Sequence, residues 1–280
     1  MAWSVRAGII ALLAIASIGA SAREGVEVPP PPFVSGLVSA DQVEQAEAQQ
    51  YAQLLAQAEA KHALAPPTHP QLVRLRVIAE RLIPHAYEWN PRARSWRWDI
   101  NLIGSSQINA FCMPGGRIAF FTGILEKLKL SDDEVAMVMG HEMTHAVREH
   151  ARAQMGKDTA TRGAIEIGSA LLGLGNLSRA ALGGLGSLLS LHYSREDETE
   201  ADLIGLELGA RAGYDPHAAV TLWQKMAAAS SGNESAAFLS THPPRETRIR
   251  DIEANIPKVE GLYARAEKPA KRYPPAGGND

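Results

Sequence analysis

The sequence predicts an α+β fold that is mainly helical, with a small β-sheet or hairpin next to one central helix. Apolar residues recur at helical spacing over most of the chain, and the period changes to two only between residues 96 and 121. A capped helical segment over 131–154 follows that region. With 280 residues, of which 45% are hydrophobic and 21% charged, the chain can bury one core with a small extension.

Residues 1–22 have the pattern of a signal peptide. Arg6 supplies a positive charge, residues 7–20 form an apolar run, and Ala20-Ser21-Ala22 fits a cleavage site. The apolar run is shorter than the about 20 residues of a membrane-spanning helix. We therefore expect an exported protein, located in the periplasm, whose signal is cleaved or kept as an anchor.

Three further segments follow the signal. Residues 23–69 are expected to hold a Pro-rich stretch and an amphipathic helix over about 41–63 that packs on the main body. The main domain is expected over 70–258, beginning with a helix from about Pro70 to Leu82. Residues 259–280 are rich in Pro and charge, which predicts a disordered tail.

The strands are predicted inside the main domain. Residues 96–102 alternate as in a half-exposed strand, and 107–113 and 117–121 predict two more strands joined by the turn Pro114-Gly115-Gly116. The single cysteine, Cys112, excludes an internal disulfide and is expected to be a buried, inert thiol. A short helix over 124–129 leads into the central one.

Small residues dominate 163–191, where we expect mobile helices that cover the functional site. Glu166 and Arg179 interrupt this segment, so it does not read as a membrane span, although a peripheral membrane contact stays open. Further helices are expected over 194–211, 215–229 and up to about 254. The net charge of −3 gives no indication of a nucleic-acid partner, and the oligomeric state is not indicated.

The central helix carries the run His141-Glu142-Met143-Thr144-His145. Residues four apart lie on one face of a helix, so His141 and His145 can bind one zinc ion. Glu142 lies beside the first ligand and can act as a general base toward a water on the metal. The alternative is a chance occurrence of these residues on an ordinary helix.

A zinc ion that keeps one position for water needs a third protein ligand. The acidic run 196–202 can be an ordinary negatively charged helix start, but Glu198 and Asp202 lie four residues apart and share a face. We expect Glu198 to bind zinc and Asp202 to accept the free ring N–H of a ligand histidine, His141. Glu200 faces away from Glu198, and His150 lies off the ligand face and is expected at the surface.

Four motifs together resemble the gluzincin metallopeptidases of family M48, which include CAAX prenyl endopeptidases, HtpX and soluble periplasmic quality-control proteases. They are the run 141–145, Ser194-Arg195 followed by Glu198, Glu200 and Asp202, the strand–turn segment 109–116, and Thr241-His242-Pro243-Pro244. The resemblance covers about residues 70–255. It implies a zincin-type domain in which Glu198 is the third zinc ligand. It also implies that Asp202 supports the metal ligands without binding the metal itself. The chain lacks the several spanning helices of the family's membrane members.

The resemblance also implies a role for His242, either as a fourth zinc ligand in a latent state or as a hydrogen-bond donor in the transition state. The alternative is a histidine in an ordinary turn. His192 and Tyr193 are expected to line the site, whereas His62, His69, His85 and His217 are expected to be solvated.

The sequence therefore predicts a zinc endopeptidase that cleaves extended or unfolded polypeptides held along an edge strand. Misfolded or misassembled envelope proteins as substrates come from the resemblance alone. The competing hypothesis is a non-catalytic envelope chaperone or adaptor that contains zinc, which the presence of Glu142 disfavours.

Overall fold

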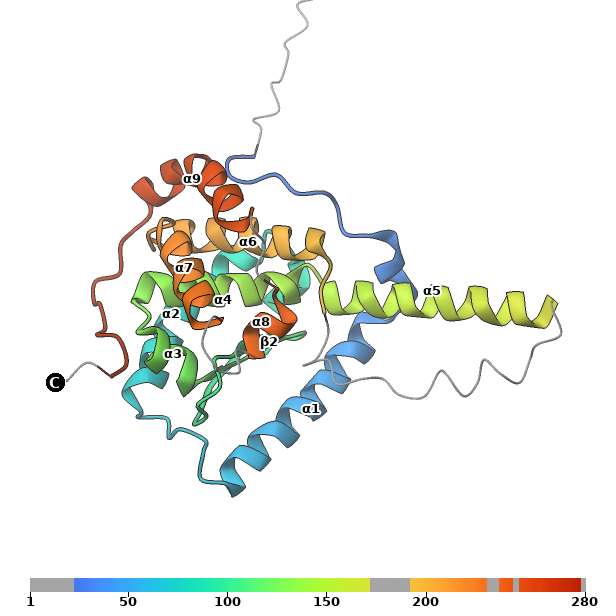
Figure 1. Cartoon of the computed structure of the whole chain (residues 1–280), viewed down its shortest axis with the longest axis horizontal. Coiled ribbons are helices and arrows are strands. Elements are labelled where there is room, and N and C mark those ends of the chain that lie inside the picture. The colour runs from blue at the N-terminus through green and yellow to red at the C-terminus, as the bar shows by residue number, and fades with distance from the viewer. Residues whose placement is uncertain (1–22, 172–191, 231–236, 244–246, 278–280) are drawn as a thin grey trace, which may run out of the picture.

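The computed structural model describes residues 23–171, 192–230, 237–243 and 247–277, with the side chains of 162–171 left aside. Helices surround a small three-stranded sheet (Figure 1). The elements in chain order are η1 (Phe33–Leu37), α1 (Ala40–Ala60), α2 (Pro70–Ala86), η2 (Pro91–Arg94), β1 (Asp99–Ile103), β2 (Ala110–Met113), β3 (Arg117–Phe121), α3 (Thr122–Leu128), α4 (Asp132–Val147), α5 (His150–Leu171), α6 (Arg195–Arg211), α7 (Ala218–Ser230), α8 (Ala237–Thr241) and α9 (Arg248–Arg265). The predicted α+β class is confirmed.

Helix α4 is the centre of the molecule, because every residue from Glu134 to Val147 is buried. It begins with the predicted capping box: Ser131 N–H donates to Glu134 Oε2 at 2.8 Å, and Glu134 N–H donates to Ser131 Oγ at 3.3 Å. Lys225 of α7 forms an ion pair with the same carboxylate at 2.7 Å. Helices α2, α6 and α7 and strand β2 pack around α4. The core therefore holds this helix on all sides.

The predicted single helix over 131–154 is two helices. Helix α4 ends at Val147, and Glu149 has a positive φ of 55° before α5 begins at His150. A left-handed residue cannot continue a right-handed helix, so the chain changes direction there. Helix α5 then projects away from the body (Figure 1).

The sheet has the order β1-β3-β2, with β1 parallel and β2 antiparallel to β3. Alternate residues face the main core and the helix α1, as Ile118 and Ala119 do on β3. Tyr51 of α1 donates a hydrogen bond to the Ile118 carbonyl at 2.7 Å. The first strand alternates as predicted, with Asp99 and Asn101 partly exposed and Ile100 and Leu102 buried, but it begins at Asp99 rather than at residue 96. Strand β2 lies at the edge of the sheet, next to α4.

Helices α4 and α6 cross at two glycines. A Cβ added to Gly140 would lie 2.8 Å from the Gly205 carbonyl oxygen, and one added to Gly205 would lie 2.7 Å from His141 N. Both distances are shorter than a carbon–heteroatom contact allows, so only glycine fits at either position. The crossing lies directly beside the His-Glu-x-x-His run.

The segment 259–277 corrects the prediction of a disordered tail. Helix α9 continues to Arg265 rather than ending near 254, and the residues that follow lie along the body. Arg272 pairs with Asp133 at 2.8 Å, and Tyr273 N–H donates to Asp132 Oδ2 at 2.8 Å. Residues 272 and 273 are therefore held against the start of α4 rather than disordered, because Asp132 and Asp133 accept hydrogen bonds from them.

The Pro-rich stretch near the N-terminus also packs. Val26 is buried, and Arg152 of α5 donates to the Ser35 carbonyl at 2.8 Å. The proposed signal, 1–22, and most of the Gly-rich segment, 172–191, lie outside the described residues. In the ranges that are described, no helix is long and apolar enough to span a membrane.

Candidate metal centre

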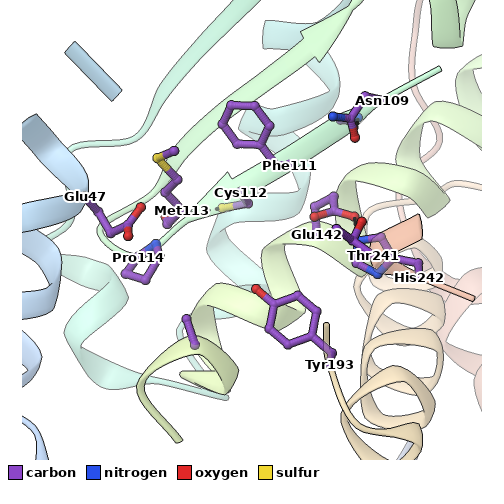
Figure 2. Close-up of a pocket in the computed structure, with 12 residues that line it drawn as sticks. Glu47, Asn109, Phe111, Cys112, Met113, Pro114, Glu142, Tyr193, Thr241 and His242 are labelled. Atoms are coloured by element: carbon purple, nitrogen blue, oxygen red, sulfur yellow. Dashed lines mark hydrogen bonds and ion pairs between the residues drawn. The ribbon is translucent and has the colours of Figure 1, made fainter. Parts of the chain in front are cut away.

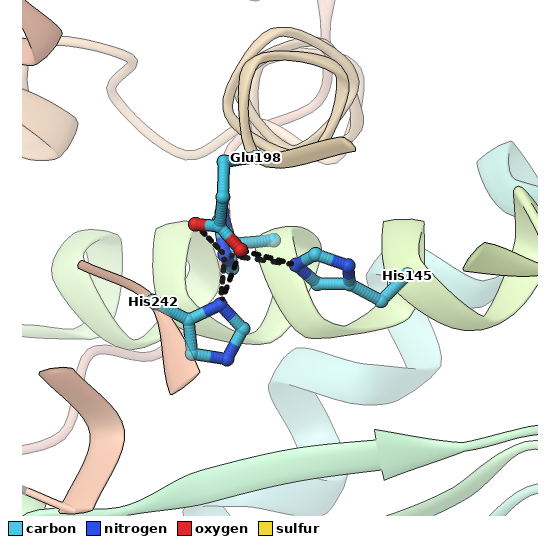
Figure 3. A group of neighbouring side chains, drawn as sticks. His145, Glu198 and His242 are labelled. Atoms are coloured by element: carbon cyan, nitrogen blue, oxygen red, sulfur yellow. Dashed lines mark hydrogen bonds and ion pairs between the residues drawn. The ribbon is translucent and has the colours of Figure 1, made fainter. Parts of the chain in front are cut away.

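Four buried side chains from three parts of the chain converge on one point. His141 and His145 come from α4, Glu198 from the first turn of α6, and His242 from the residue after α8. One ligand atom from each lies within 4.8 Å of the others, and every one of the four residues is at most 3% exposed. Figure 3 shows Glu198 pointing from α6 toward the His145 and His242 rings. This is the predicted group, with His242 included.

The spacing of the donor atoms suits a tetrahedral ion. Two ligands that each lie 2.0–2.1 Å from a tetrahedral zinc are about 3.3 Å apart. In this structure His141 Nε2 lies 3.2 Å from both His145 Nε2 and His242 Nδ1. Glu198 Oε1 lies 2.8 Å from His242 Nδ1 and 3.5 Å from His145 Nε2. Three imidazoles and one carboxylate are also a donor set that zinc prefers.

Asp202 lies where the sequence predicts, beside the outward nitrogen of His141. Its Oδ1 is 3.1 Å from His141 Nδ1, and Arg248 of α9 donates to the same oxygen at 2.7 Å. A carboxylate only accepts hydrogen bonds, so Nδ1 carries the proton and Nε2 is left with its lone pair. Burial acts against the charge of Asp202, but Arg248 and His141 outweigh it and lower the pKa of the carboxyl.

Arg248 itself is a feature that the sequence analysis did not identify. It is 1% exposed, stacks 3.3 Å from the centroid of the Trp223 ring, and lies 3.1 Å from Glu198 Oε2. Its guanidinium therefore neutralises part of the charge of Glu198 and Asp202 together. Its position six residues after His242, at the start of α9, is the only signal of this role in the sequence.

His150 is buried, which corrects its assignment to the surface. The break between α4 and α5 turns its ring back, so that His150 Nδ1 lies 2.9 Å from His145 Nδ1. On its other side Nε2 lies 3.4 Å from Glu200 Oε2. Glu200 also pairs with Arg148 at 2.7 Å. The prediction that Glu200 faces away from the ligand group agrees with this position, since it partners His150 instead.

Glu142 lies next to the cluster and lines a pocket with His242, Tyr193 and strand β2 (Figure 2). One wall of this pocket, which we call the β2 pocket, is the segment 109–114. Glu142 Oε1 is buried and makes no hydrogen bond to the residues that the structure describes, although His242 Nε2 is 3.3 Å away. Burial raises the pKa of Glu142 to about 7, against the opposing charge of His242. A carboxylate with a free oxygen beside the donor cluster can accept a proton there.

Of the two expected lining residues, Tyr193 is confirmed and His192 is not. The Tyr193 ring stacks on His145 with centroids 4.0 Å apart, whereas His192 is exposed. His62 and His217 are exposed as predicted. His69 differs, because its Nδ1 accepts a hydrogen bond from Gln71 N–H and caps α2; His85 is half-buried.

The match to known proteins agrees with this geometry. The model of the peptidase family M48 matches residues 71–256, which include the whole donor cluster. This chain belongs to peptidase family M48. Metalloproteases of this family use zinc, and the donor cluster is the place where the described residues could hold it.

Three relatives illustrate the similarity of this M48 chain. It is 36% identical over 199 residues to the mitochondrial metalloendopeptidase OMA1 of Schizosaccharomyces pombe, covering 70% of this chain and 56% of that protein. It is 38% identical over 162 residues to OMA1 of Arabidopsis thaliana, covering 57% and 32%. It is 32% identical over 151 residues to the metalloprotease LoiP of Escherichia coli, covering 53% and 58%. The chain thus matches between about a third and three fifths of the length of these relatives.

Proposed function

We propose that this chain is an exported zinc endopeptidase in which His141, His145 and Glu198 hold the metal. One observation carries the proposal: the buried donor cluster lies beside a carboxylate, Glu142, that lines the β2 pocket and whose Oε1 accepts no hydrogen bond from the described residues. The names of the relatives support the reaction type, since they are metalloendopeptidases and a metalloprotease. The pattern of residues 1–22 supports export to the periplasm or an equivalent envelope compartment.

The residues around the cluster hold His141 and His145 as neutral imidazoles, each with its lone pair directed toward the metal position. Asp202 fixes the proton of His141 on Nδ1, and the chain of contacts from His145 through His150 to Glu200 does the same for the second ring. Zinc, when bound, supplies Lewis acidity that polarises a carbonyl and lowers the pKa of a water. Glu142 would accept the proton of the water that attacks the carbonyl and would pass it to the amine that leaves when the C–N bond breaks.

The substrate is proposed to lie extended along β2. This strand is at the sheet edge, and no strand in the described part of the chain pairs with its other side. Main-chain hydrogen bonds to an edge strand hold a peptide with little dependence on its side chains. Such binding would suit misfolded or misassembled envelope proteins, which we propose as the substrate class.

His242 is proposed to restrain the enzyme as a fourth ligand in a latent state. Its Nδ1 faces His141 and Glu198 while its Nε2 faces Glu142, so the ring stands between the metal donors and the base. The alternative, a donor to the developing oxyanion, uses the same position. A non-catalytic chaperone is less well supported, because such a protein has no use for a buried carboxylate, Glu142, beside the metal donors.

The test is the substitution Glu142→Gln, which preserves shape and leaves the proposed ligands in place. We expect casein digestion to disappear while the zinc content stays near one ion per chain, and a chelator to abolish digestion by the unmodified protein. Glu126→Gln, on the exposed face of α3, is the matched control and should digest casein normally. Digestion by Glu142→Gln at the unmodified rate would overturn the proposed mechanism.

A further inference from the structure

Glu47 of α1 is a buried carboxylate that the proposed mechanism does not use. It is 0% exposed, and within the described part of the chain neither of its carboxylate oxygens has a hydrogen-bond partner. The positive charge that acts on it, Arg117, is directed elsewhere, since Arg117 Nη1 donates to the Pro114 carbonyl at 2.9 Å. Burying an unpaired carboxylate is costly, so such a group in a folded protein calls for an explanation, for which a partner that binds it is a candidate.

The position of Glu47 on its helix is also unusual. The side of α1 that packs inward carries Val43, Glu47, Tyr51 and Ala58, so Glu47 interrupts an otherwise apolar stripe. An apolar residue at this position would pack on the sheet without loss of solvation. Helix stability therefore does not account for a glutamate here.

The carboxylate lies in the wall of the β2 pocket, together with Glu142 and His242. Figure 2 shows it pointing from α1 toward Met113 and Pro114, at the opposite end of the segment from Asn109. The backbone of Cys112 contacts Glu142, and Pro114 is two residues further on. Because a strand rises about 3.3 Å per residue, Glu47 is within reach of a side chain about one to three residues from the scissile bond.

The neighbours of Glu47 suit a long side chain with a charged end. Phe111 and Met113 project to the α1 side of the sheet and line the same pocket. Apolar walls can hold the methylene stem of a lysine or arginine while a carboxylate binds the cationic head. An acidic side chain would instead meet an uncompensated negative charge.

We propose that Glu47 is a specificity-determining residue that binds a lysine or arginine side chain of the substrate, close to the cleaved bond. The inference rests on the proposed endopeptidase function and adds a side-chain preference to it. Main-chain pairing along β2 positions the peptide, and Glu47 selects among the registers in which the peptide can pair. The arrival of the cation provides the partner that the carboxylate lacks.

The test uses full-length zinc-loaded protein and quenched fluorogenic peptides with acetylated N-termini. A first library locates the cleaved bond and the position of any basic residue; a pair of peptides then differs only there, with lysine or the uncharged norleucine. We expect kcat/KM for the lysine peptide to exceed that for its partner by at least about tenfold. Glu47→Gln should bring this ratio close to one, and Glu47→Asp should retain part of it. Glu59→Gln, an exposed change on the same helix, should keep the full ratio.

The outcomes separate the two proposals. Equal cleavage of the peptide pair by the unmodified protein, or an unchanged ratio in Glu47→Gln, overturns the role of Glu47 and leaves the endopeptidase proposal intact. Cleavage of neither peptide nor of any library member overturns both. A preference that appears only when the peptides have free N-termini would assign Glu47 to the terminal amine and would also overturn the proposal. Thermal unfolding of each variant shows that loss of selectivity is not loss of the fold.

Discussion

His150 Nδ1 lies 2.9 Å from His145 Nδ1, so two imidazoles share one proton at the edge of the donor cluster. Glu200 decides which ring donates it, because the neutral His150 ring has one N–H, and the carboxylate near Nε2 accepts a hydrogen bond from it there. His150 Nδ1 is then an acceptor, and His145 Nδ1–H is the donor. The second proposed ligand is thus oriented by a histidine, where the first is oriented by Asp202.

The first prediction follows from that contact. His150→Leu should weaken zinc binding by about 10- to 100-fold, because His145 loses the group that fixes its tautomer and ring orientation. Competition with a chromophoric chelator measures the affinity. His217→Leu, at an exposed histidine, is the control. Equal affinities of the two variants would show that His150 does not position the ligand.

The second prediction compares the two glutamates of α6. Glu198→Ala should remove most of the zinc, because it deletes a donor from the cluster, whereas Glu200→Ala should cost only about tenfold in affinity through His150. Metal titration of both purified variants gives the order. A larger loss for Glu200→Ala would move the ligand to Glu200 and contradict the structural arrangement.

The third prediction concerns His242. If the ring closes the site, His242→Ala should raise the basal digestion of an unfolded substrate at unchanged or slightly lower zinc content. If it donates to the oxyanion, the same variant should lose about 100- to 1,000-fold in kcat. Rates with zinc content measured alongside distinguish the two roles. No change in either quantity would return His242 to an ordinary turn histidine.

The fourth prediction is a pH dependence of stability at Glu47, whose carboxylate interacts electrostatically with Arg117 and Tyr193. Burial raises the pKa of Glu47 to about 7, against the lowering effect of Arg117. Between about pH 4.5 and 7 the folded protein keeps a proton that the unfolded chain has lost, so the stability due to this group falls as the pH rises through that window. Glu47→Gln cannot ionise and should therefore be more stable than the unmodified protein at pH 8, on the order of 2 kcal/mol, and no more stable at pH 4.

Thermal unfolding at the two pH values measures that difference, which corresponds to a rise in Tm of about 5 °C at pH 8. Glu59→Gln, at an exposed position, should show no such dependence. An equal effect of Glu47→Gln at pH 4 and pH 8 would contradict the assigned pKa shift. A variant that gains stability while losing its selectivity for lysine would show that the carboxylate is retained for binding.

Much of the site could be predicted because it depends on residues that are close together in the sequence. The helical period places His141 and His145 on one face, and the capping boxes at Ser131 and Ser194 fix where their helices begin. The pairing of Asp202 with His141 follows from a spacing of four residues on α6. Each of these relationships needs only short-range geometry and the ordinary chemistry of the residue types.

The remaining features depend on contacts between distant segments. The left-handed Glu149 ends α4 early and turns His150 inward, and no turn residue in the sequence announces this break. Arg248 reaches the site only because α9 packs on α6. The ordered tail depends on Asp132 and Asp133 accepting hydrogen bonds from residues about 140 positions away. The Pro- and charge-rich composition of the tail predicted disorder. Composition alone cannot show that two aspartates elsewhere in the chain bind this segment.

The glycine crossing of α4 and α6 has a consequence for how this protein can change. Gly205 lies seven residues after Glu198, on the same face of α6, and Gly140 directly precedes His141. The separation of the two backbones at this point therefore sets how far the carboxylate stands from the imidazoles. A methyl group at either glycine would widen the spacing of the donor atoms without altering any of them. Two positions with no side chain thus set the distance between the carboxylate and the imidazoles, so a substitution at either is expected to weaken metal binding although it removes no ligand.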